Sequence, residues 1–135
     1  RDSKYPSAEI FAIDILEMEQ IKGVKFIQED LRNIEKIDQL SSLKNKFNLV
    51  ISDLAPNLSG ISSIDEENIL ELNLLTLEGA IKFLDNNGVF IVKTFQNSNL
   101  KKFRKEMEKN LKIVQTAKPA ASKKQSKEIY LYGIK

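Results

Sequence analysis

The sequence predicts an α/β protein with a mostly parallel, doubly wound sheet. Two observations support this fold class: short, nearly continuous apolar runs recur along the chain, and segments of helical periodicity alternate with them. Strands of a parallel sheet are covered on both faces, so they appear as unbroken apolar runs. The length of 135 residues fits a single domain. No apolar run approaches the ~18 residues of a membrane-spanning helix, so we expect no such segment.

Six segments are predicted to be strands. They share runs of Ile, Val, Leu, Phe or Tyr, and polar or turn-forming residues bound them. The first and third runs each end at an aspartate, Asp14 and Asp53, and the second ends near Asp30. The expected strands are residues 10–13, 24–27, 47–52, 88–94, 111–116 and 129–134.

Three segments, residues 33–44, 65–85 and 98–110, have the spacing of amphipathic helices. We expect Asp65 and Asn68 to cap the start of the second helix, and residues 86–88 to end it in a left-handed conformation. The expected inward-facing side chains are Ile34, Ile37, Leu40 and Leu43 in the first helix, Ile69, Leu72, Thr76, Ala80 and Phe83 in the second, and Leu100, Phe103 and Met107 in the third. The outward-facing cations of the third helix are Lys101, Lys102, Arg104 and Lys105, predicted to be its solvated face.

The composition excludes several kinds of chemistry. The chain has no cysteine, which excludes disulfides, thiolate metal sites and a cysteine nucleophile. It has no histidine, which excludes a histidine-based triad and an ordinary zinc site. Acid–base chemistry must therefore come from Lys, Asp, Glu or Tyr. The net charge of +2 is too small to indicate nucleic-acid binding by itself.

Ionisable residues gather at the carboxyl ends of the expected strands. Asp14, Asp30 and Asp53 follow three of them, and Lys93 lies near the end of a fourth. In open α/β sheets, ligands bind outside this edge. Aspartates are also common there because they make turns and cap helices, which is the simpler interpretation of each one alone. Together, their order is typical of a nucleoside-binding cleft, in which carboxylates accept hydrogen bonds from ribose hydroxyls and an adenine amino group.

The segment 52–60, with the sequence Ser-Asp-Leu-Ala-Pro-Asn-Leu-Ser-Gly, resembles the signature loop of the FtsJ/RrmJ-type family of ribosomal RNA large subunit (uridine) 2′-O-methyltransferases. Other stretches resemble that family in order and spacing. They are residues 12–18 with 23–30, residues 88–96, and residues 118–119, 122 and 126–130. The resemblance covers nearly the whole chain. The Ala-Pro-Asn form of the loop resembles the ribosomal branch more than the transfer-RNA branch.

This resemblance implies a Rossmann-like fold that binds S-adenosyl-L-methionine, with the last strand antiparallel. It implies 2′-O-methylation of a ribose in large-subunit ribosomal RNA, with a uridine as the expected target. Ribosomal RNA or the large ribosomal subunit is then the expected partner, and we expect a monomer that uses no metal and no membrane. The compartment would be the cytoplasm in a bacterium, and a mitochondrion, another organelle or the nucleolus in a eukaryote.

The resemblance also assigns roles to residues. The family uses a Lys-Asp-Lys-Glu tetrad, and Asp53, Lys93 and Glu128 match its last three members. Asp14 matches the acid that holds the cofactor ribose, Asp30 matches the acid near the adenine, and Asp53 lies by the methionine end. Lys93 is then the candidate general base, or the group that orients the 2′-oxygen and stabilises its developing charge. The neighbouring carboxylates should raise the pKa of Lys93, which opposes the first role.

Four lysines crowd the loop before the last strand: Lys118, Lys123, Lys124 and Lys127. In the family's layout this loop borders the catalytic face, so we predict that these lysines contact RNA phosphates. A solvated loop without RNA contacts is the alternative. Two alternative functions also stay open: a transfer-RNA or cap 2′-O-methyltransferase of the same fold, and a non-catalytic RNA-binding relative active in ribosome assembly.

The resemblance departs from the family at the front of the chain. The glycine-rich cofactor loop and the first tetrad lysine are absent, and their place is upstream of Arg1. The strand before that loop is central in the family's sheet, between the segments 10–13 and 47–52. We therefore expect residues 1–135 to be one methyltransferase domain without its N-terminal part, with two unpaired strand edges and an exposed apolar area. We expect the chain to be inactive alone.

Overall fold

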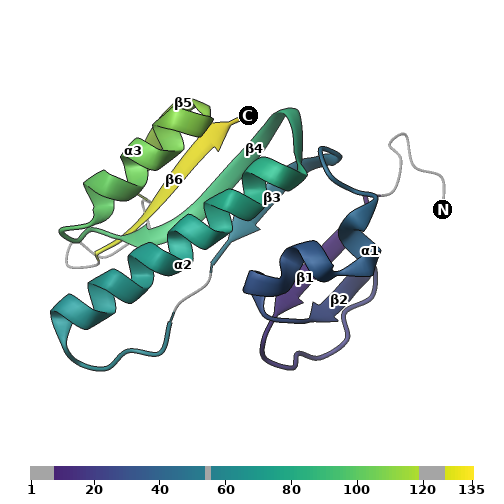
Figure 1. The fold of residues 1–135 in the computed structure, drawn as a ribbon, viewed down its shortest axis with the longest axis horizontal. Helices are drawn as coiled ribbons and strands as arrows, with labels where there is room; N and C mark the ends of the chain where they lie inside the picture. Colours follow the sequence, from purple (N-terminus) through teal and green to yellow (C-terminus); the bar gives the residue numbers. More distant parts are fainter. Residues whose placement is uncertain (1–7, 54–55, 119–126) are drawn as a thin grey trace.

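The computed structural model describes residues 8–53, 56–118 and 127–135. Within these residues, six strands and four helical segments follow one another in α/β order (Figure 1). The strands are β1 (Ile10–Asp14), β2 (Val24–Gln28), β3 (Phe47–Ser52), β4 (Leu84–Phe95), β5 (Lys112–Ala117) and β6 (Glu128–Ile134). The helical segments are the 3-10 helix η1 (Leu31–Lys36), α1 (Asp38–Ser41), α2 (Ser62–Phe83) and α3 (Leu100–Asn110).

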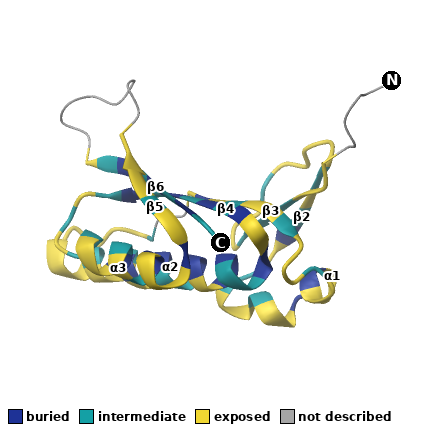
Figure 2. Cartoon of the chain, turned by 90° about the horizontal axis from the view of Figure 1, so that it is seen from above, coloured by how far each residue is buried: buried dark blue, intermediate teal, exposed yellow. Residues whose placement is uncertain are grey.

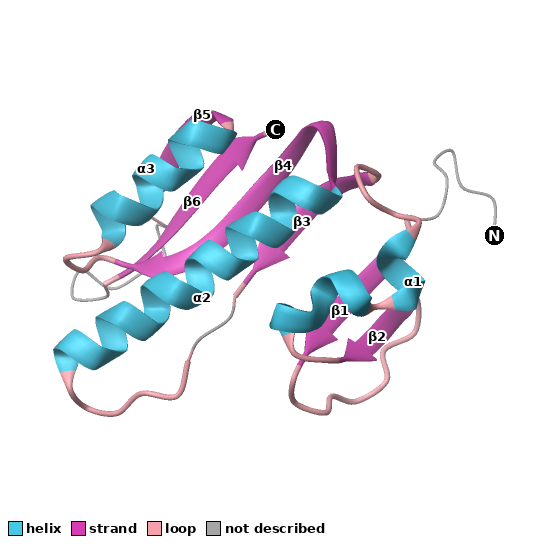
Figure 3. Ribbon diagram, in the orientation of Figure 1, coloured by secondary structure: helices cyan, strands magenta, loops and turns pink. Residues whose placement is uncertain are grey.

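The strands form two separate sheets (Figure 3). One sheet pairs β1 with β2 in parallel, and the other has the order β3-β4-β6-β5. In the second sheet β3 and β4 are parallel, whereas β6 runs antiparallel to both β4 and β5. Since β6 is the one reversed strand of that sheet, the prediction of a mostly parallel fold with an antiparallel last strand is confirmed.

The described helices all lie on one side of the sheets, as Figure 2 shows. The long helix α2 and the shorter α3 pack on the larger sheet and enclose the main core. Its most buried large side chains include Leu84, Phe90, Phe103, Met107 and Leu131. No described helix covers the opposite face of either sheet, so the second layer expected of a doubly wound sheet is not among the described residues.

A second, smaller core lies under the β1–β2 sheet. It consists of the buried side chains Ile27, Ile37, Leu40 and Phe83, with half-buried neighbours around them. The Phe47 ring packs edge-on against Phe11, with ring centroids 5.6 Å apart, and against Phe83, at 6.2 Å. These aromatic contacts connect the two sheets within the second core, because Phe11 belongs to β1, Phe47 to β3 and Phe83 to α2.

The first predicted helix, residues 33–44, is wrong in its details. It is divided into η1 and α1 at Ile37, which has an extended backbone with φ −81° and ψ 109°. Apolar side chains at three-residue steps suit a 3-10 turn, whose side chains at i and i+3 eclipse. The break keeps Ile37 and Leu40 buried, at 6% and 2% exposure.

The predicted caps of α2 are also wrong. The helix begins at Ser62 after Ile61, which makes no side-chain cap, and Asp65 lies inside the first turn. At the other end, β4 follows directly from Leu84, and the left-handed Asn87 (φ 69°) lies within β4. No glycine cap is needed there, because the ammonium of Lys135 donates to the carbonyls of Ile81 and Leu84, at 2.6 and 2.8 Å.

The helices α2 and α3 differ from the prediction in which side chains they bury and which they expose. In α2, Ile69 and Leu72 are only half-buried, while the polar Asn73 is 5% exposed. In α3, Arg104 is not part of the solvated face: its guanidinium donates to the Val114 carbonyl at 2.9 Å and to the Thr116 hydroxyl. Arg104 thereby fastens α3 to the edge strand β5.

Candidate active site

Lys93 is the centre of a charged cluster on the larger sheet. Its neighbours Val92 and Thr94 are buried toward the helices, so alternation along β4 directs Lys93 to the face without described helices. Its ammonium lies 2.7 Å from Asp53 Oδ1 and 4.0 Å from Glu128 Oε2. The side chain is 24% exposed, so part of it remains accessible to solvent.

Strand pairing places the two carboxylates beside Lys93. Ser52 lies opposite Val92 in the parallel β3–β4 pair, so Asp53 leaves β3 next to Lys93. Glu128 lies opposite Phe95 in the antiparallel β4–β6 pair, two residues from Tyr130, which lies opposite Lys93. Residues two apart on a strand share a face of the sheet, so Glu128 and Lys93 project to the same side. Three segments far apart in sequence therefore converge on one cluster.

The carboxylates hold Lys93 in its charged form. The hydrogen bond to Asp53 is the main cause of the raised pKa of Lys93, and the charges of Asp53 and Glu128 add to it. Burial acts in the opposite direction and is outweighed. The sequence prediction that these carboxylates raise the pKa of Lys93 is confirmed. At neutral pH, Lys93 is therefore an ammonium that can donate hydrogen bonds and offset negative charge.

Asp65, which the sequence predicted only as a helix cap, binds the segment that leads into α2. Asp65 accepts three hydrogen bonds: from the amide and hydroxyl of Ser59, at 2.7 and 2.8 Å, and from the amide of Gly60 at 3.1 Å. These bonds lower the pKa of Asp65, with the Ser59 amide contributing most. Gly60 has φ +85°, a left-handed conformation that suits glycine. The sequence signal for this contact is an aspartate that follows Ser59 by six residues, in the first turn of α2.

The sequence profile of the FtsJ-like methyltransferase family matches residues 3–135. The chain belongs to this family. The ribosomal RNA large subunit methyltransferase E of Dechloromonas aromatica is 43% identical over 126 residues, which are 92% of this chain and 62% of that protein. The protein of the same name from Acinetobacter baylyi is 40% identical, over 92% of this chain and 58% of its own length. The chain thus spans about three fifths of the length of these relatives.

Solved structures show the same fold. A Plasmodium falciparum protein described as a ribosomal RNA methyltransferase superposes with a TM-score of 0.76 at 24% identity, over 93% of this chain and 71% of its own. A Streptococcus mutans methyltransferase, solved in complex with SAH, superposes with a TM-score of 0.58 at 16% identity, over 93% of this chain and 70% of its own. At these identities the likeness concerns the fold alone, and it confirms the methyltransferase fold class.

In this FtsJ-like chain, Asp14 and Asp30 lie at the ends of β1 and β2, where the sequence predicted them. Each also makes a local contact of the kind expected of an aspartate that only forms a turn or caps a helix. Asp14 Oδ1 accepts from the Leu16 amide at 3.0 Å, a turn contact. Asp30 caps η1 by accepting from the Arg32 amide at 2.9 Å, and its other oxygen pairs with the Arg32 guanidinium at 3.4 Å. Among the described residues, neither forms an ion pair with Lys93.

The lysines predicted to contact RNA are only partly described. Lys118 follows β5, Lys127 precedes β6, and both are exposed. The carbonyl of Lys127 accepts from the Gln96 amide at 2.7 Å, which holds the start of β6 against the end of β4 beside Glu128. Lys123 and Lys124 lie outside the described residues. Lys118 and Lys127 therefore lie at the end of the larger sheet that also carries the Lys93 cluster.

A buried polar contact supports the site from beneath and was not predicted. The amide of Asn73 in α2 donates to the Thr94 hydroxyl at 2.7 Å, and both residues are at most 5% exposed. Thr94 follows Lys93, so this bond fixes the strand end that presents the lysine. The sequence signal for this contact is a polar residue, Asn73, on the otherwise apolar face of α2.

Among residues 8–53, 56–118 and 127–135, no group of three or more Asp or Glu side chains is arranged to hold a metal ion. Over the same ranges, no helix combines the length and the apolar character needed to cross a membrane.

Proposed function

We propose that the full-length protein containing this chain transfers a methyl group from S-adenosyl-L-methionine to the 2′-oxygen of a ribose in large-subunit ribosomal RNA, with a uridine as the target. The Asp53–Lys93–Glu128 cluster carries the proposal, because it brings one ammonium and two carboxylates together at the rim of a methyltransferase fold. Relatives named ribosomal RNA large subunit methyltransferase E, at 40–43% identity, support this substrate class.

The described rim offers acceptors that fit the cofactor. Asp14 and Asp30 end adjacent parallel strands, and the Glu29 amide donates to the Asp14 carbonyl at 3.0 Å, which keeps the two strand ends together. Asp14 would accept hydrogen bonds from the cofactor ribose, Asp30 from the adenine amino group, and Asp53 would lie by the methionine end. When bound, the cofactor supplies an activated methyl group.

Lys93 acts as a hydrogen-bond donor and a positive charge in this proposal. Its raised pKa keeps it protonated at neutral pH, so it cannot take the 2′-hydroxyl proton as it stands. The ammonium would orient the 2′-oxygen and offset the negative charge that grows as the hydroxyl proton passes to solvent water. A general base needs a pKa of roughly 7–8, which would require a further cation or the loss of the Asp53 contact. Asp53 and Glu128 hold the ammonium in place.

Methyl transfer from labelled S-adenosyl-L-methionine to large ribosomal subunits tests the proposal in the full-length protein. Lys93→Ala should lower the rate by about 100-fold or more, the scale of a lost catalytic proton or charge contact. Cofactor affinity should stay unchanged, because the proposal assigns Lys93 to the acceptor oxygen and assigns the cofactor contacts to Asp14, Asp30 and Asp53. Lys105→Ala, an exposed lysine on α3, is the matched control and should have no effect. Methylation at the wild-type rate by Lys93→Ala would exclude this role of Lys93.

The same assay separates the substrate classes. Transfer RNA and capped RNA should be poor substrates beside large subunits, and methylation of either in preference to subunits would favour the alternative enzymes. A protein that binds subunits but transfers no methyl group would be the non-catalytic relative. The retained cluster of Asp53, Lys93 and Glu128 speaks against that outcome, since a binding protein has no need of it.

The lysine loop is proposed to bind the RNA backbone. Charge reversal at Lys123 and Lys124 should weaken binding of large-subunit RNA and flatten its dependence on salt, because fewer phosphate counterions are released. The same change at Lys101 and Lys102, two exposed lysines on α3, is the matched control. Binding unchanged by the loop variant would remove these two lysines from the RNA site.

A further inference from the structure

The end of β4 that carries Lys93 extends beyond the end of β3. The last pair of the parallel β3–β4 ladder is Ser52 with Val92, whereas the antiparallel β4–β6 ladder continues to Phe95. Among the described strands, residues 93–95 therefore have a ladder partner on one edge only. A strand end with one neighbour opens more easily than one between two neighbours. Contacts outside the ladder therefore bear on the position of Lys93.

Helix α2 supplies such a contact beneath this strand end. The Asn73 amide donates to the Thr94 hydroxyl at 2.7 Å, and the two residues are 5% and 2% exposed. Thr94 follows Lys93 directly, and alternation along the strand points the two side chains to opposite faces. The side chains beside the buried pair include the apolar Leu70 and Phe103. In such surroundings a hydrogen bond is stronger than in water, and a partner left unpaired is costly.

The same helix also holds the segment that follows β4. The Ser98 hydroxyl donates to the Glu66 carboxylate at 2.8 Å, and the Asn99 amide donates to the Glu67 carboxylate at 3.5 Å. Both contacts are exposed, so water competes for the same groups and their net contribution is smaller. The bond from Asn73 is therefore the contact of α2 with this strand end that is best shielded from water.

We propose that Asn73 is a positioning residue for the Lys93 ammonium, which it holds in place through Thr94. By fixing the end of β4, it keeps the ammonium 2.7 Å from Asp53 Oδ1 and so sets where the acceptor 2′-oxygen binds. A misplacement of about 1 Å in a group that orients a reactant can lower a rate by about 100-fold. The effect on the rate rests on the proposed function, whereas the effect on the position of Lys93 does not.

The charge state of Lys93 reports how closely Asp53 holds it. The hydrogen bond to Asp53 is the main cause that raises the pKa of Lys93 above its ordinary 10.5, and burial opposes it. The charges of Asp53, Glu128 and Tyr130 raise this pKa further. A looser Asp53 contact therefore lowers the pKa of Lys93, and at a given pH more of the side chain is a neutral amine. The neutral amine reacts with acylating reagents, whereas the ammonium does not.

Trace acetylation of the full-length protein tests the position of Lys93 without cofactor or RNA. Acetic anhydride is added in small amounts at slightly alkaline pH, and mass spectrometry gives the labelling of Lys93 relative to the exposed Lys105. Asn73→Leu and Thr94→Val should each raise this ratio severalfold, because both loosen the Asp53 contact. A ratio unchanged in both variants would overturn the proposal.

Methyl transfer to large ribosomal subunits tests the effect on the rate. Asn73→Leu and Thr94→Val should each lower kcat by about 10-fold or more, because they displace the group that orients the acceptor. The KM for subunits and the cofactor affinity should stay unchanged, since neither variant removes a binding contact. Thr94→Ser keeps the hydroxyl and should keep a kcat close to that of the wild type. Equal losses in Thr94→Ser and Thr94→Val would show that packing, and not the hydrogen bond, positions Lys93.

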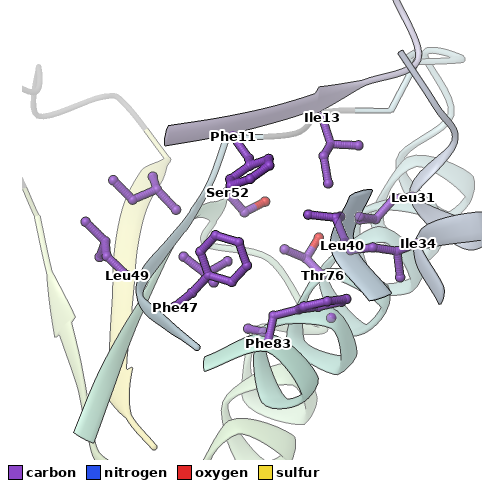
Figure 4. Close-up of a pocket in the computed structure, with 14 residues that line it drawn as sticks. Phe11, Ile13, Leu31, Ile34, Leu40, Phe47, Leu49, Ser52, Thr76 and Phe83 are labelled. Carbon is purple, nitrogen blue, oxygen red and sulfur yellow. The ribbon is translucent and has the colours of Figure 1, made fainter. Parts of the chain in front are cut away.

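Thr76→Val is the matched control on the same helix. Thr76 is 6% exposed, and its hydroxyl donates to the Leu72 carbonyl at 2.8 Å, a bond within α2. Figure 4 shows Thr76 in the pocket between β1 and β3, which no described residue of β4 lines. The control removes a buried hydroxyl away from the strand end, so the labelling of Lys93 and kcat should stay at wild-type values. Effects equal to those of Asn73→Leu would refute a specific role of Asn73.

The double variant Asn73→Leu with Thr94→Val serves if the single variants unfold. Each single change leaves a buried polar group unpaired, whereas the double change leaves none, so its urea midpoint should recover toward the wild type. The raised labelling of Lys93 and the lowered kcat should persist, and their recovery together with the midpoint would overturn the assignment. If the wild type transfers no methyl group, the proposed function fails, and the labelling of Lys93 alone decides the role of Asn73.

Discussion

The two sheets of this chain differ in how well they are buried. In the larger sheet Phe90, Val92 and Leu131 have no exposed surface, and α3 adds Met107 with none. In the β1–β2 sheet one strand residue, Ile27, is buried, at 8% exposure. Both regions have apolar strands of the same kind, so composition does not explain the difference. The difference in burial follows from the number of strands and helices that pack around each strand.

A strand becomes fully buried when it has neighbours on both edges and cover on a face. β4 has β3 and β6 beside it and the 22-residue α2 beneath. Among the described strands, β1 has one neighbour, and the four-residue α1 and the 3-10 helix η1 are its local cover. The smaller sheet therefore depends on its contacts with α2, which contributes Phe83 to the second core. This difference leads to three predictions for the full-length protein.

The largest effect should come from the main core. Phe103 is 1% exposed and packs between α3 and the larger sheet. Phe103→Ala should lower the free energy of unfolding by about 3–5 kcal/mol, the usual cost of the cavity left by a phenylalanine. Urea unfolding measures it, and Ile21→Ala, at a position 54% exposed, is the control that should stay within about 0.5 kcal/mol. A loss below about 1 kcal/mol for Phe103→Ala would contradict the main core as the stable unit.

A smaller and more local effect should come from the second core. Leu40 in α1 is 2% exposed beneath the β1–β2 sheet. Leu40→Ala should cost about 2–3 kcal/mol, the lower part of the range for a buried leucine, because this core is thin. Hydrogen exchange should speed up in β2 and stay unchanged in β4, since the two regions open separately. Equal acceleration in both strands would show that the sheets unfold as one unit.

The smallest effect should come from the ion pair between the two regions. Lys82 of α2 lies 2.5 Å from Glu35 of η1, and both side chains are substantially exposed. Lys82→Gln should lower the urea midpoint only slightly, and the difference should vanish at high salt. Lys109→Gln, which removes a pair within α3, is the matched control and should not affect exchange in β2. A large effect that persists at high salt would contradict a screened surface pair.

The pH dependence of this ion pair follows from its two pKa shifts. The hydrogen bond between them lowers the pKa of Glu35 below 4.5 and raises that of Lys82 above 10.5. The contribution of Glu35 is therefore present above pH 4.5 and is lost as the pH falls through its lowered pKa. The contribution of Lys82 is present below pH 10.5 and is lost as the pH rises through its raised pKa. The difference between wild type and Lys82→Gln should be constant between these limits.

The sequence by itself predicted the strands closely, because apolar runs and their bounding turns are local properties. It also predicted the Asp53, Lys93 and Glu128 cluster, through the resemblance to the FtsJ family. Strand pairing then placed the three side chains together, since β4 lies between β3 and β6.

Only the tertiary structure decided the features that depend on partners distant in the chain. The break at Ile37 accompanies the burial of that residue under β1 and β2, and at the end of α2 the Lys135 ammonium binds the carbonyls of Ile81 and Leu84. Arg104 looks solvated in the helical pattern, yet it binds β5. The separation of the two sheets is likewise set by which strand edges meet. Periodicity reports which face of a segment is apolar, but the partner of that face comes from another part of the chain.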